Sequence, residues 1–256
     1  MPLVVIPARW ASVRFPGKPL ALIAGKSLVQ RVWEQARQSR LADEIVVATE
    51  DERIIRAARA FGADARMTSA DHATGSDRVA EIASGSKQDI IVNVQGDEPL
   101  IDPIAIDAAI RPLQQEASIV ASSLMRPLAP EEIDNPNIVK VVVDRRGDSI
   151  YFSRHAIPYQ RDRAPGEPPI PRWAHIGIYC FRRTFLLEYT RMVPTPLETA
   201  ERLEQLRILE NGRRLRMVPT DYIGFGVDTP DDVTRTESLL AARSSPSPNS
   251  TNGGPK

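Results

Sequence analysis

The chain has 256 residues, with 33 Lys and Arg against 33 Asp and Glu, so its formal net charge is zero. This balance argues against a broadly basic nucleic-acid-binding protein, and 42% hydrophobic residues argue against a disordered chain. The single cysteine, Cys180, cannot form an intrachain disulfide, and no stretch approaches the ~20 apolar residues of a membrane-spanning helix. We therefore expect a soluble cytoplasmic protein with no nucleic-acid or membrane partner.

Short β-branched runs alternate with helical periods over residues 3–124. The runs predict strands at Leu3–Ile6, Ile45–Thr49, Ile90–Val94 and Ser118–Leu124. Helices are predicted between them at Ser27–Ser39, Asp51–Phe61, Ser76–Ala83 and Pro103–Gln115. Ser27 and Asp51 are suitable N-caps, and Gly62 is suited to the position after a helix. The alternation predicts right-handed βαβ units and therefore an α/β fold with a mainly parallel sheet.

The pattern changes in the second half of the chain. A hairpin is predicted from Ile138–Asp144 and Ser149–Phe152, and the proline-rich residues 158–173 predict a mobile loop over a site. Further predictions are a strand at His175–Phe181, one helix at Leu197–Glu210 and a last helix at Asp231–Ala242. Residues 244–256 contain no apolar side chain, so we expect a disordered tail after a single domain of residues 1–243.

The loop after the first strand is rich in basic residues. It carries Arg9, Arg14 and Lys18 and no acid, and the first acidic residue of the chain is Glu34. In a parallel sheet, ligands bind at the carboxyl ends of the strands. Guanidinium and ammonium groups beside the backbone amides near Gly17 suit a polyphosphate, although a solvated basic loop would have the same composition.

Two aspartates are candidate ligands for a metal. Asp97 follows the strand Ile90–Val94, and Asp228 precedes a helix that Thr229 can cap without it. Carboxylates of this kind, together with substrate phosphates, suit Mg²⁺, whereas ordinary turns would explain the same residues. The three histidines form no cluster with cysteine, so a zinc site is not expected.

The motifs together resemble a known family. PARWASVRFPGKPL, DHATGSDR, NVQGDEPLI, YFSRHAIPY, HIGIYCFR, PLETAERLEQLR and GVDTPDD occur in the order found in 3-deoxy-manno-octulosonate (Kdo) cytidylyltransferases. The resemblance covers residues 3–242. It implies a Rossmann-like mixed sheet of the nucleotide-diphospho-sugar transferase type, flanked by helices, with an inserted hairpin and dimerisation region. Residues 1–125 would then form the nucleotide-binding half, and residues 126–243 the half for sugar binding and dimerisation.

The resemblance also implies an activity and its site residues. The family makes CMP-Kdo and pyrophosphate from CTP and Kdo for lipopolysaccharide biosynthesis. On this basis Lys18, Asp97, Asp228 and Arg9 would be catalytic, with Mg²⁺ held by Asp97 and Asp228. CTP would be bound by Arg9, Arg14, Lys18, Thr74, Ser76 and Arg78. Kdo would be bound by Gln95, Arg154, His175, Tyr179, Glu204 and Gln205.

Three alternatives remain open from the sequence. The sugar acid could be a sialic acid or an amino derivative of Kdo instead of Kdo. The chain could also be a non-catalytic nucleotide-binding homologue, although the metal-binding acids argue against that, or a glycosyltransferase of similar build. The resemblance further implies a homodimer, and the edge of the hairpin within 138–152 offers strand pairing for it.

Overall fold

The computed structural model describes residues 1–11, 15–162, 166 and 168–244. Within these residues, nine strands form one sheet. Its main path runs in the order β11 (Leu215–Pro219), β7 (Ala121–Pro127), β10 (Trp173–Arg182), β6 (Ile90–Asn93), β1 (Pro2–Pro7), β4 (Glu44–Thr49) and β5 (Asp64–Met67). The hairpin of β8 (Lys140–Val143) and β9 (Ser149–Ser153) attaches to β10.

The predicted mixed, mainly parallel sheet is confirmed. β1 runs parallel to β4 and β6, β4 to β5, and β11 to β7, whereas β10 is antiparallel to both β6 and β7. In the register of the centre, Val5 lies beside Val46 of β4 and Asn93 of β6. The carboxyl ends of β1, β4 and β6 therefore reach the same edge of the sheet.

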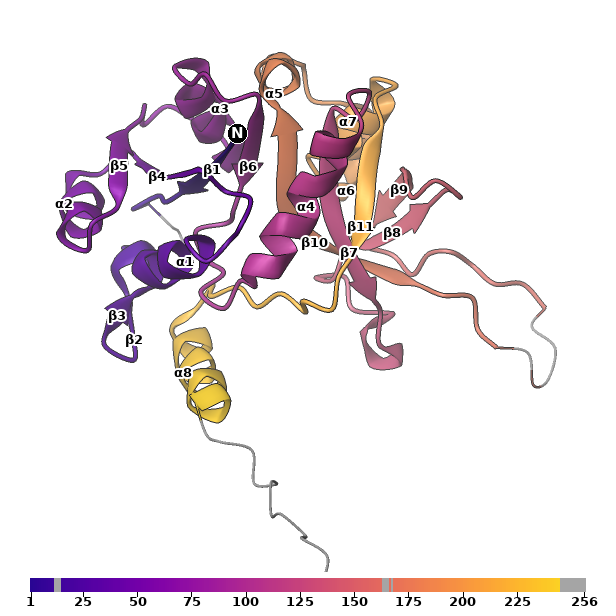
Figure 1. Ribbon diagram of the computed structural model, residues 1–256. Coiled ribbons are helices and arrows are strands. Elements are labelled where there is room, and N and C mark those ends of the chain that lie inside the picture. The colour runs from indigo at the N-terminus through magenta and orange to yellow at the C-terminus, as the bar shows by residue number, and fades with distance from the viewer. Residues whose placement is uncertain (12–14, 163–165, 167, 245–256) are drawn as a thin grey trace, which may run out of the picture.

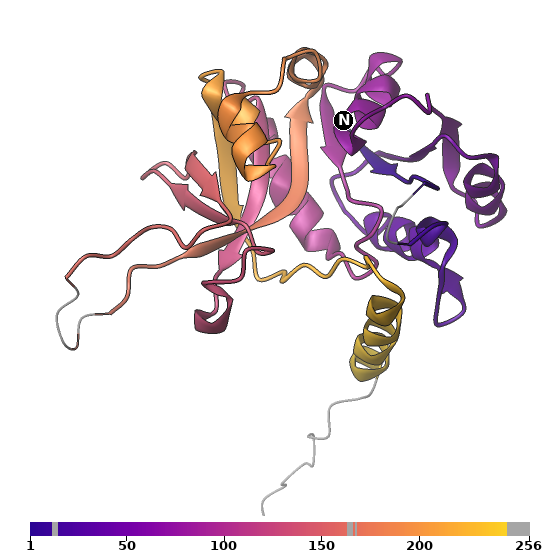
Figure 2. The same ribbon diagram turned by 180° about the vertical axis from the view of Figure 1, so that it is seen from behind.

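Helices cover both faces of the sheet (Figures 1 and 2). Val4 and Ile6 of β1 face the core formed with α1 (Leu28–Ala36), α2 (Glu52–Ala60) and α4 (Pro103–Gln115). Leu3 and Val5 face the opposite core, formed with α3 (Gly75–Ser84) and α5 (Arg183–Tyr189). Because successive side chains of a strand point to opposite faces, a continuously apolar strand supplies both cores.

The helix ends follow the predicted capping residues. The Ser27 hydroxyl accepts a hydrogen bond from the backbone N–H of Gln30, and the Asp51 carboxylate accepts one from Arg53. Gly62, with φ 88°, follows α2, and Pro103 is the first residue of α4. These contacts satisfy backbone donors that an α-helix leaves unpaired at its start.

The prediction of one helix over Leu197–Glu210 is wrong. The structure has two short helices, α6 (Pro196–Glu201) and α7 (Leu206–Glu210), separated by Arg202 in a left-handed conformation with φ 53°. Leu203 and Leu206 are buried, so the apolar residues behind the prediction do face the core. A spacing pattern does not reveal a single residue that reverses the backbone, and this reversal forms the elbow that carries Glu204 and Gln205.

Several other elements differ from the prediction. The strand predicted at Ser118–Leu124 begins later, at Ala121. The sequence reading missed β5, β11, α5 and the small hairpin of β2 (Leu22–Ile23) and β3 (Lys26–Ser27). β11 has five residues, and Arg216 lies between the buried Leu215 and Met217, so the strand is only partly apolar. Short strands of this kind give a weak period-2 signal, and their place in the sheet comes from pairing with β7.

The hairpin predicted around residues 138–152 is confirmed as β8 and β9, and the last helix is α8 (Pro230–Ser244). Between β9 and β10 the chain makes a long excursion away from the sheet (Figure 1). Residues 163–165 and 167 of this excursion, and the tail expected from residue 245, lie outside the described residues. Among the described residues, no helix is long and apolar enough to cross a bilayer.

Candidate active site

Three segments that are distant in sequence meet through one lysine. Lys18 begins the 3-10 turn η1 (Lys18–Leu20), Asp97 follows β6, and Asp228 precedes α8. The Lys18 Nζ donates to Asp97 Oδ2 at 2.9 Å and to Asp228 Oδ1 at 3.2 Å. The structure therefore brings together the predicted basic residue and both predicted metal ligands, with the carboxylates converging on a single cation position.

Two glycines allow this close approach of loops. A Cβ atom on Gly96 would lie 2.4 Å from the carbonyl oxygen of Pro7, so the turn after β6 could not pack against the end of β1 with a larger residue. Gly17 has φ 70°, and its Cβ would lie 2.9 Å from the Trp10 ring. The backbone N–H of Gly17 also donates to the Trp10 carbonyl, which closes the first loop.

A cavity of about 450 Å³ opens beside Lys18 and the two aspartates. Arg9 and Thr74 line it, and the Arg9 Nη1 donates to the Ala73 carbonyl at 3.3 Å. Thr74 also caps α3, since its hydroxyl accepts from the Asp77 backbone N–H. Arg14, the other predicted phosphate ligand, lies outside the described residues. The described part of the basic loop therefore faces a cavity that ends at the two carboxylates.

The structure corrects the expected role of Arg78. This side chain was expected to contact the nucleotide, but it is only 1% exposed and does not line the cavity. Its guanidinium lies 2.8 Å from Glu50 Oε2 and donates to Thr68. The other oxygen of Glu50 accepts the backbone N–H of Trp10 at 2.9 Å. Because Arg78 is buried, its charge is paired with Glu50 and does not reach a ligand. Arg78 therefore supports the basic loop indirectly, through Glu50.

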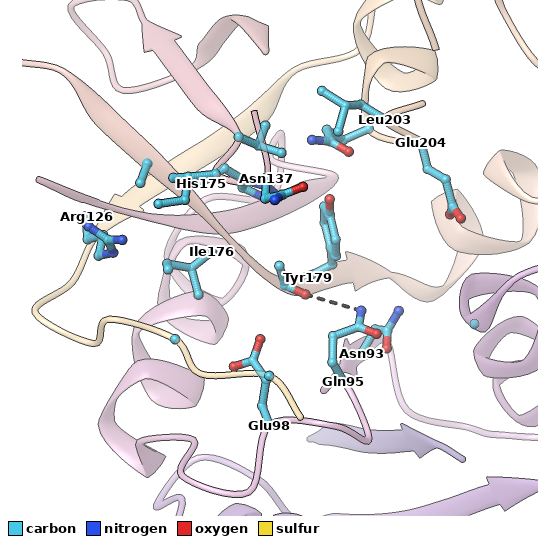
Figure 3. A pocket seen from close by; sticks show the side chains of 18 of the residues that line it. Asn93, Gln95, Glu98, Arg126, Asn137, His175, Ile176, Tyr179, Leu203 and Glu204 are labelled. Atoms are coloured by element: carbon cyan, nitrogen blue, oxygen red, sulfur yellow. Dashed lines mark hydrogen bonds between the residues drawn. The ribbon is translucent and has the colours of Figure 1, made fainter. Parts of the chain in front are cut away.

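A second, larger cavity of about 790 Å³ adjoins the first. Gly75, Gln95 and Glu204 line both cavities. All the residues predicted to hold the sugar line the larger one: Gln95, Arg154, His175, Tyr179, Glu204 and Gln205. Figure 3 labels Gln95, His175, Tyr179 and Glu204 among them. Ser76, predicted for the nucleotide, lines this cavity instead of the smaller one, and its hydroxyl donates to Glu204 at 3.2 Å. The described residues that the sequence predicted for the site, apart from Arg78, therefore line two neighbouring cavities.

His175 and Tyr179 form the uncharged part of the larger cavity. The His175 ring packs against Phe152 and Tyr179, and its Nε2 lies 2.8 Å from the Ser123 hydroxyl. Burial lowers the pKa of His175 to about 3, and burial also raises the pKa of Tyr179 well above its ordinary value. Both side chains are therefore uncharged near neutral pH, and they can orient a ligand by hydrogen bonds without moving a proton.

Arg154 supplies positive charge to the larger cavity. Its guanidinium donates to main-chain carbonyls of Glu201, Pro136 and Arg202, while its own backbone N–H donates to the Glu201 carboxylate. These partners fix the side chain with carbonyl dipoles, and the guanidinium keeps its charge for an anionic ligand. The planar guanidinium group matches the geometry of a carboxylate or a phosphate.

The elbow between α6 and α7 presents Glu204 and Gln205. A buried ion pair between Arg207 and Glu198 joins the two helices, and the Tyr189 hydroxyl donates to the Glu204 carbonyl at 2.9 Å. Burial raises the pKa of the Glu204 carboxyl group. Gln205 is 4% exposed and lines the larger cavity.

Glu98 and Glu50 are among the acids at the site that the sequence reading missed. Glu98 lines the larger cavity, and burial raises its pKa to about 7. Glu50 holds the basic loop as described above. Glu98 lies in the same NVQGDEPLI segment as Asp97, and its position after a buried strand was a usable signal. Glu50 has no comparable signal, because its partners lie 28 and 40 residues away.

Comparisons with known proteins agree with this geometry. The family model described as cytidylyltransferase matches residues 3–215. A 3-deoxy-manno-octulosonate cytidylyltransferase of Solibacter usitatus is 52% identical over 241 residues, covering 94% of each chain. The enzyme of the same name from Geobacter metallireducens is 51% identical, covering 93% of this chain and 96% of the relative.

Solved structures extend the comparison. A structure of CMP:2-keto-3-deoxy-manno-octonic acid synthetase complexed with CTP superimposes with a TM-score of 0.89 at 38% identity, covering 94% of this chain and 99% of the other. A glucose-1-phosphate thymidylyltransferase from Bacillus anthracis superimposes with a TM-score of 0.66 at 15% identity, over 97% and 98% of the two chains. The second likeness concerns the fold alone.

The Glu50 contacts yield a prediction. In Glu50→Gln the Arg78 guanidinium loses its counter-ion and the basic loop loses a fixed anchor, so we expect the dissociation constant of CTP to rise about tenfold, or ~1.4 kcal/mol. Isothermal titration of folded protein measures it, with exposed Glu52→Gln as the matched control. A lower free energy of unfolding together with unchanged CTP affinity would show that the ion pair serves stability alone.

Proposed function

The chain belongs to the family of 3-deoxy-manno-octulosonate cytidylyltransferases, and on that premise we propose that it activates Kdo with CTP, giving CMP-Kdo and pyrophosphate. The observation that carries the proposal is that the cavity holding the Lys18, Asp97 and Asp228 cluster adjoins a second, larger cavity, with Gly75, Gln95 and Glu204 lining both. One cavity has basic walls suited to a triphosphate. The other offers a guanidinium and several hydrogen-bonding groups, which suit a sugar acid.

The reaction joins two anions. The anomeric hydroxyl oxygen of Kdo attacks the α-phosphorus of CTP, the bond between the α-phosphorus and the bridging oxygen breaks, and pyrophosphate leaves with the electron pair. The hydroxyl proton passes to water. Since the substrates repel each other, most of the catalytic work is positioning and charge neutralisation. Arg9 and Lys18 would bind the phosphates, and Arg154 would bind the carboxylate of the sugar acid.

Two carboxylates and the phosphates of CTP form a donor set suited to Mg²⁺, which prefers oxygen ligands and keeps several waters. Asp97 and Asp228 already converge on one cation position. When bound there, Mg²⁺ would lower the pKa of the attacking hydroxyl and neutralise charge at the α-phosphate. Lys18 would then turn its ammonium group toward the departing pyrophosphate.

Pyrophosphate release tests the activity. With CTP, Mg²⁺ and Kdo we expect continuous release of pyrophosphate and formation of CMP-Kdo, while ATP, GTP and UTP serve as nucleotide controls. A sialic acid and an amino derivative of Kdo test the choice of sugar. Release of a nucleoside diphosphate would point to a glycosyltransferase, and the absence of turnover with every sugar acid, despite CTP binding, would point to a nucleotide-binding homologue.

The two aspartates yield a second prediction. Asp97→Asn and Asp228→Asn each remove one charge from the cation position, so we expect kcat to fall about a hundredfold or more, or ~3 kcal/mol. The apparent affinity for Mg²⁺ should fall as well, while the thermal unfolding temperature stays near that of the parent protein. Wild-type turnover at the same Mg²⁺ concentration in either variant would remove the metal assignment. Asp231→Asn, an exposed aspartate in the first turn of α8, is the matched control.

We also propose a cellular setting for the enzyme. Activation of Kdo would supply an activated sugar to lipopolysaccharide biosynthesis, and the cytoplasm would be its location. The buried free thiol of Cys180 fits a reducing compartment.

A homodimer is the proposed assembly. The excursion between β9 and β10 extends from the body (Figure 2), and exposed apolar side chains occur on it at Tyr159 and Ile170 and on β9 at Ile150. Such side chains are suited to burial against a second copy. We expect light scattering at micromolar concentration to give twice the mass of 28.3 kDa. The mass of a monomer would contradict the proposal.

A further inference from the structure

We propose that Glu98, held by Tyr222, forms a subsite that accepts a hydrogen bond from a hydroxyl group of the sugar acid and thereby selects the sugar. The inference rests on the proposed function. It adds a specificity-determining residue outside the group that the sequence predicted for the sugar.

Consecutive carboxylates serve different cavities at the end of β6. Asp97 lines the smaller cavity, with Lys18, whereas Glu98 lines the larger one. The turn that carries both is fixed, because Gly96 packs against Pro7 and the Asp97 carbonyl accepts the backbone N–H of Val227 at 2.8 Å. The separation of the two side chains is therefore a property of the rigid turn.

Tyr222 fixes the Glu98 carboxylate. Its hydroxyl donates to Glu98 Oε2 at 2.7 Å, and its side chain is only 8% exposed. Figure 3 shows the carboxylate directed into the space between Gln95 and Ile176. Tyr222 belongs to the segment that leads to Asp228, so the same stretch of chain supports the sugar cavity and the cation position.

The partners of the Glu98 carboxyl group decide what it can bind. Glu132, another acid at this cavity, is neutralised by Arg126, whereas no described basic residue forms an ion pair with Glu98. With Tyr222 on one oxygen and no basic partner, the Glu98 carboxyl group can accept a hydrogen bond from a hydroxyl group, and it offers no positive charge to the carboxylate of a sugar acid. Glu98 therefore faces the polyol part of the substrate, and the carboxylate of the substrate faces Arg154. A site built to accept a hydroxyl hydrogen bond discriminates strongly against analogues that lack it.

The test combines substitutions in the protein with deletions in the substrate. Glu98→Ala, Tyr222→Phe and the control Glu131→Ala, at an exposed position, are assayed for kcat/KM with Kdo and with Kdo analogues that each lack one hydroxyl. We expect Glu98→Ala to lower kcat/KM for Kdo about a hundredfold, and Tyr222→Phe about tenfold, with CTP affinity unchanged. For one analogue, kcat/KM with the parent protein should be about a hundredfold lower than for Kdo. For that analogue, Glu98→Ala should lower kcat/KM by less than a further threefold.

Two results would overturn the subsite. One is that Glu98→Ala lowers kcat/KM by the same factor for Kdo and for every analogue. That result would mean that Glu98 contacts none of the hydroxyl groups removed. The other is unchanged activity of both Glu98→Ala and Tyr222→Phe with Kdo. Absence of CMP-Kdo formation by the parent protein is a separate result and contradicts the proposed function instead. If Glu98→Ala does not fold, the same comparison of analogues with Tyr222→Phe decides the question.

Discussion

The contact of Lys18 with Asp97 and Asp228 is the constraint on which the rest of the site depends. A cation between two carboxylates offsets their repulsion, and here the two carboxylates come from residues 79 and 210 positions from Lys18. To satisfy this contact, the first loop, the turn after β6 and the segment before α8 must all reach one edge of the sheet. Gly96 and Gly17 permit that approach, and the Arg78 and Glu50 pair holds the first loop in place.

The site separates charge according to the task of each cavity. The smaller cavity carries the bases and acids that suit phosphates and a divalent cation. The larger cavity contains uncharged His175 and Tyr179, together with the Arg154 guanidinium, which main-chain carbonyls hold in place. This division lets a single edge of a sheet bind two anionic substrates, because each carboxylate or phosphate meets its own positive group. Glu204 and Gly75 lie at the boundary between the two cavities.

The sequence predicted much of the first half of the fold. Continuous apolar strands, the caps at Ser27 and Asp51 and the alternation with helices depend on local interactions, and the structure has them. The prediction of one helix over Leu197–Glu210 failed at Arg202, where one left-handed residue turns the chain. β11 was missed because its place comes from pairing with β7 and not from its own pattern. Arg78 was expected to contact the nucleotide, but in the structure it pairs with Glu50.

The local pattern of the sequence indicated several of the chemical groups in the site, because strand ends and basic or acidic loops are local features. It placed Lys18 and Asp97 at the same edge and indicated Asp228 as a second candidate metal ligand. Only the tertiary structure decided how they combine: that Lys18 lies between both aspartates, that Arg78 faces Glu50, and that Asp97 and Glu98 line different cavities. The physical reason is that these contacts join residues up to 210 positions apart, whose separation in space is set by the packing of the whole sheet and not by any local pattern.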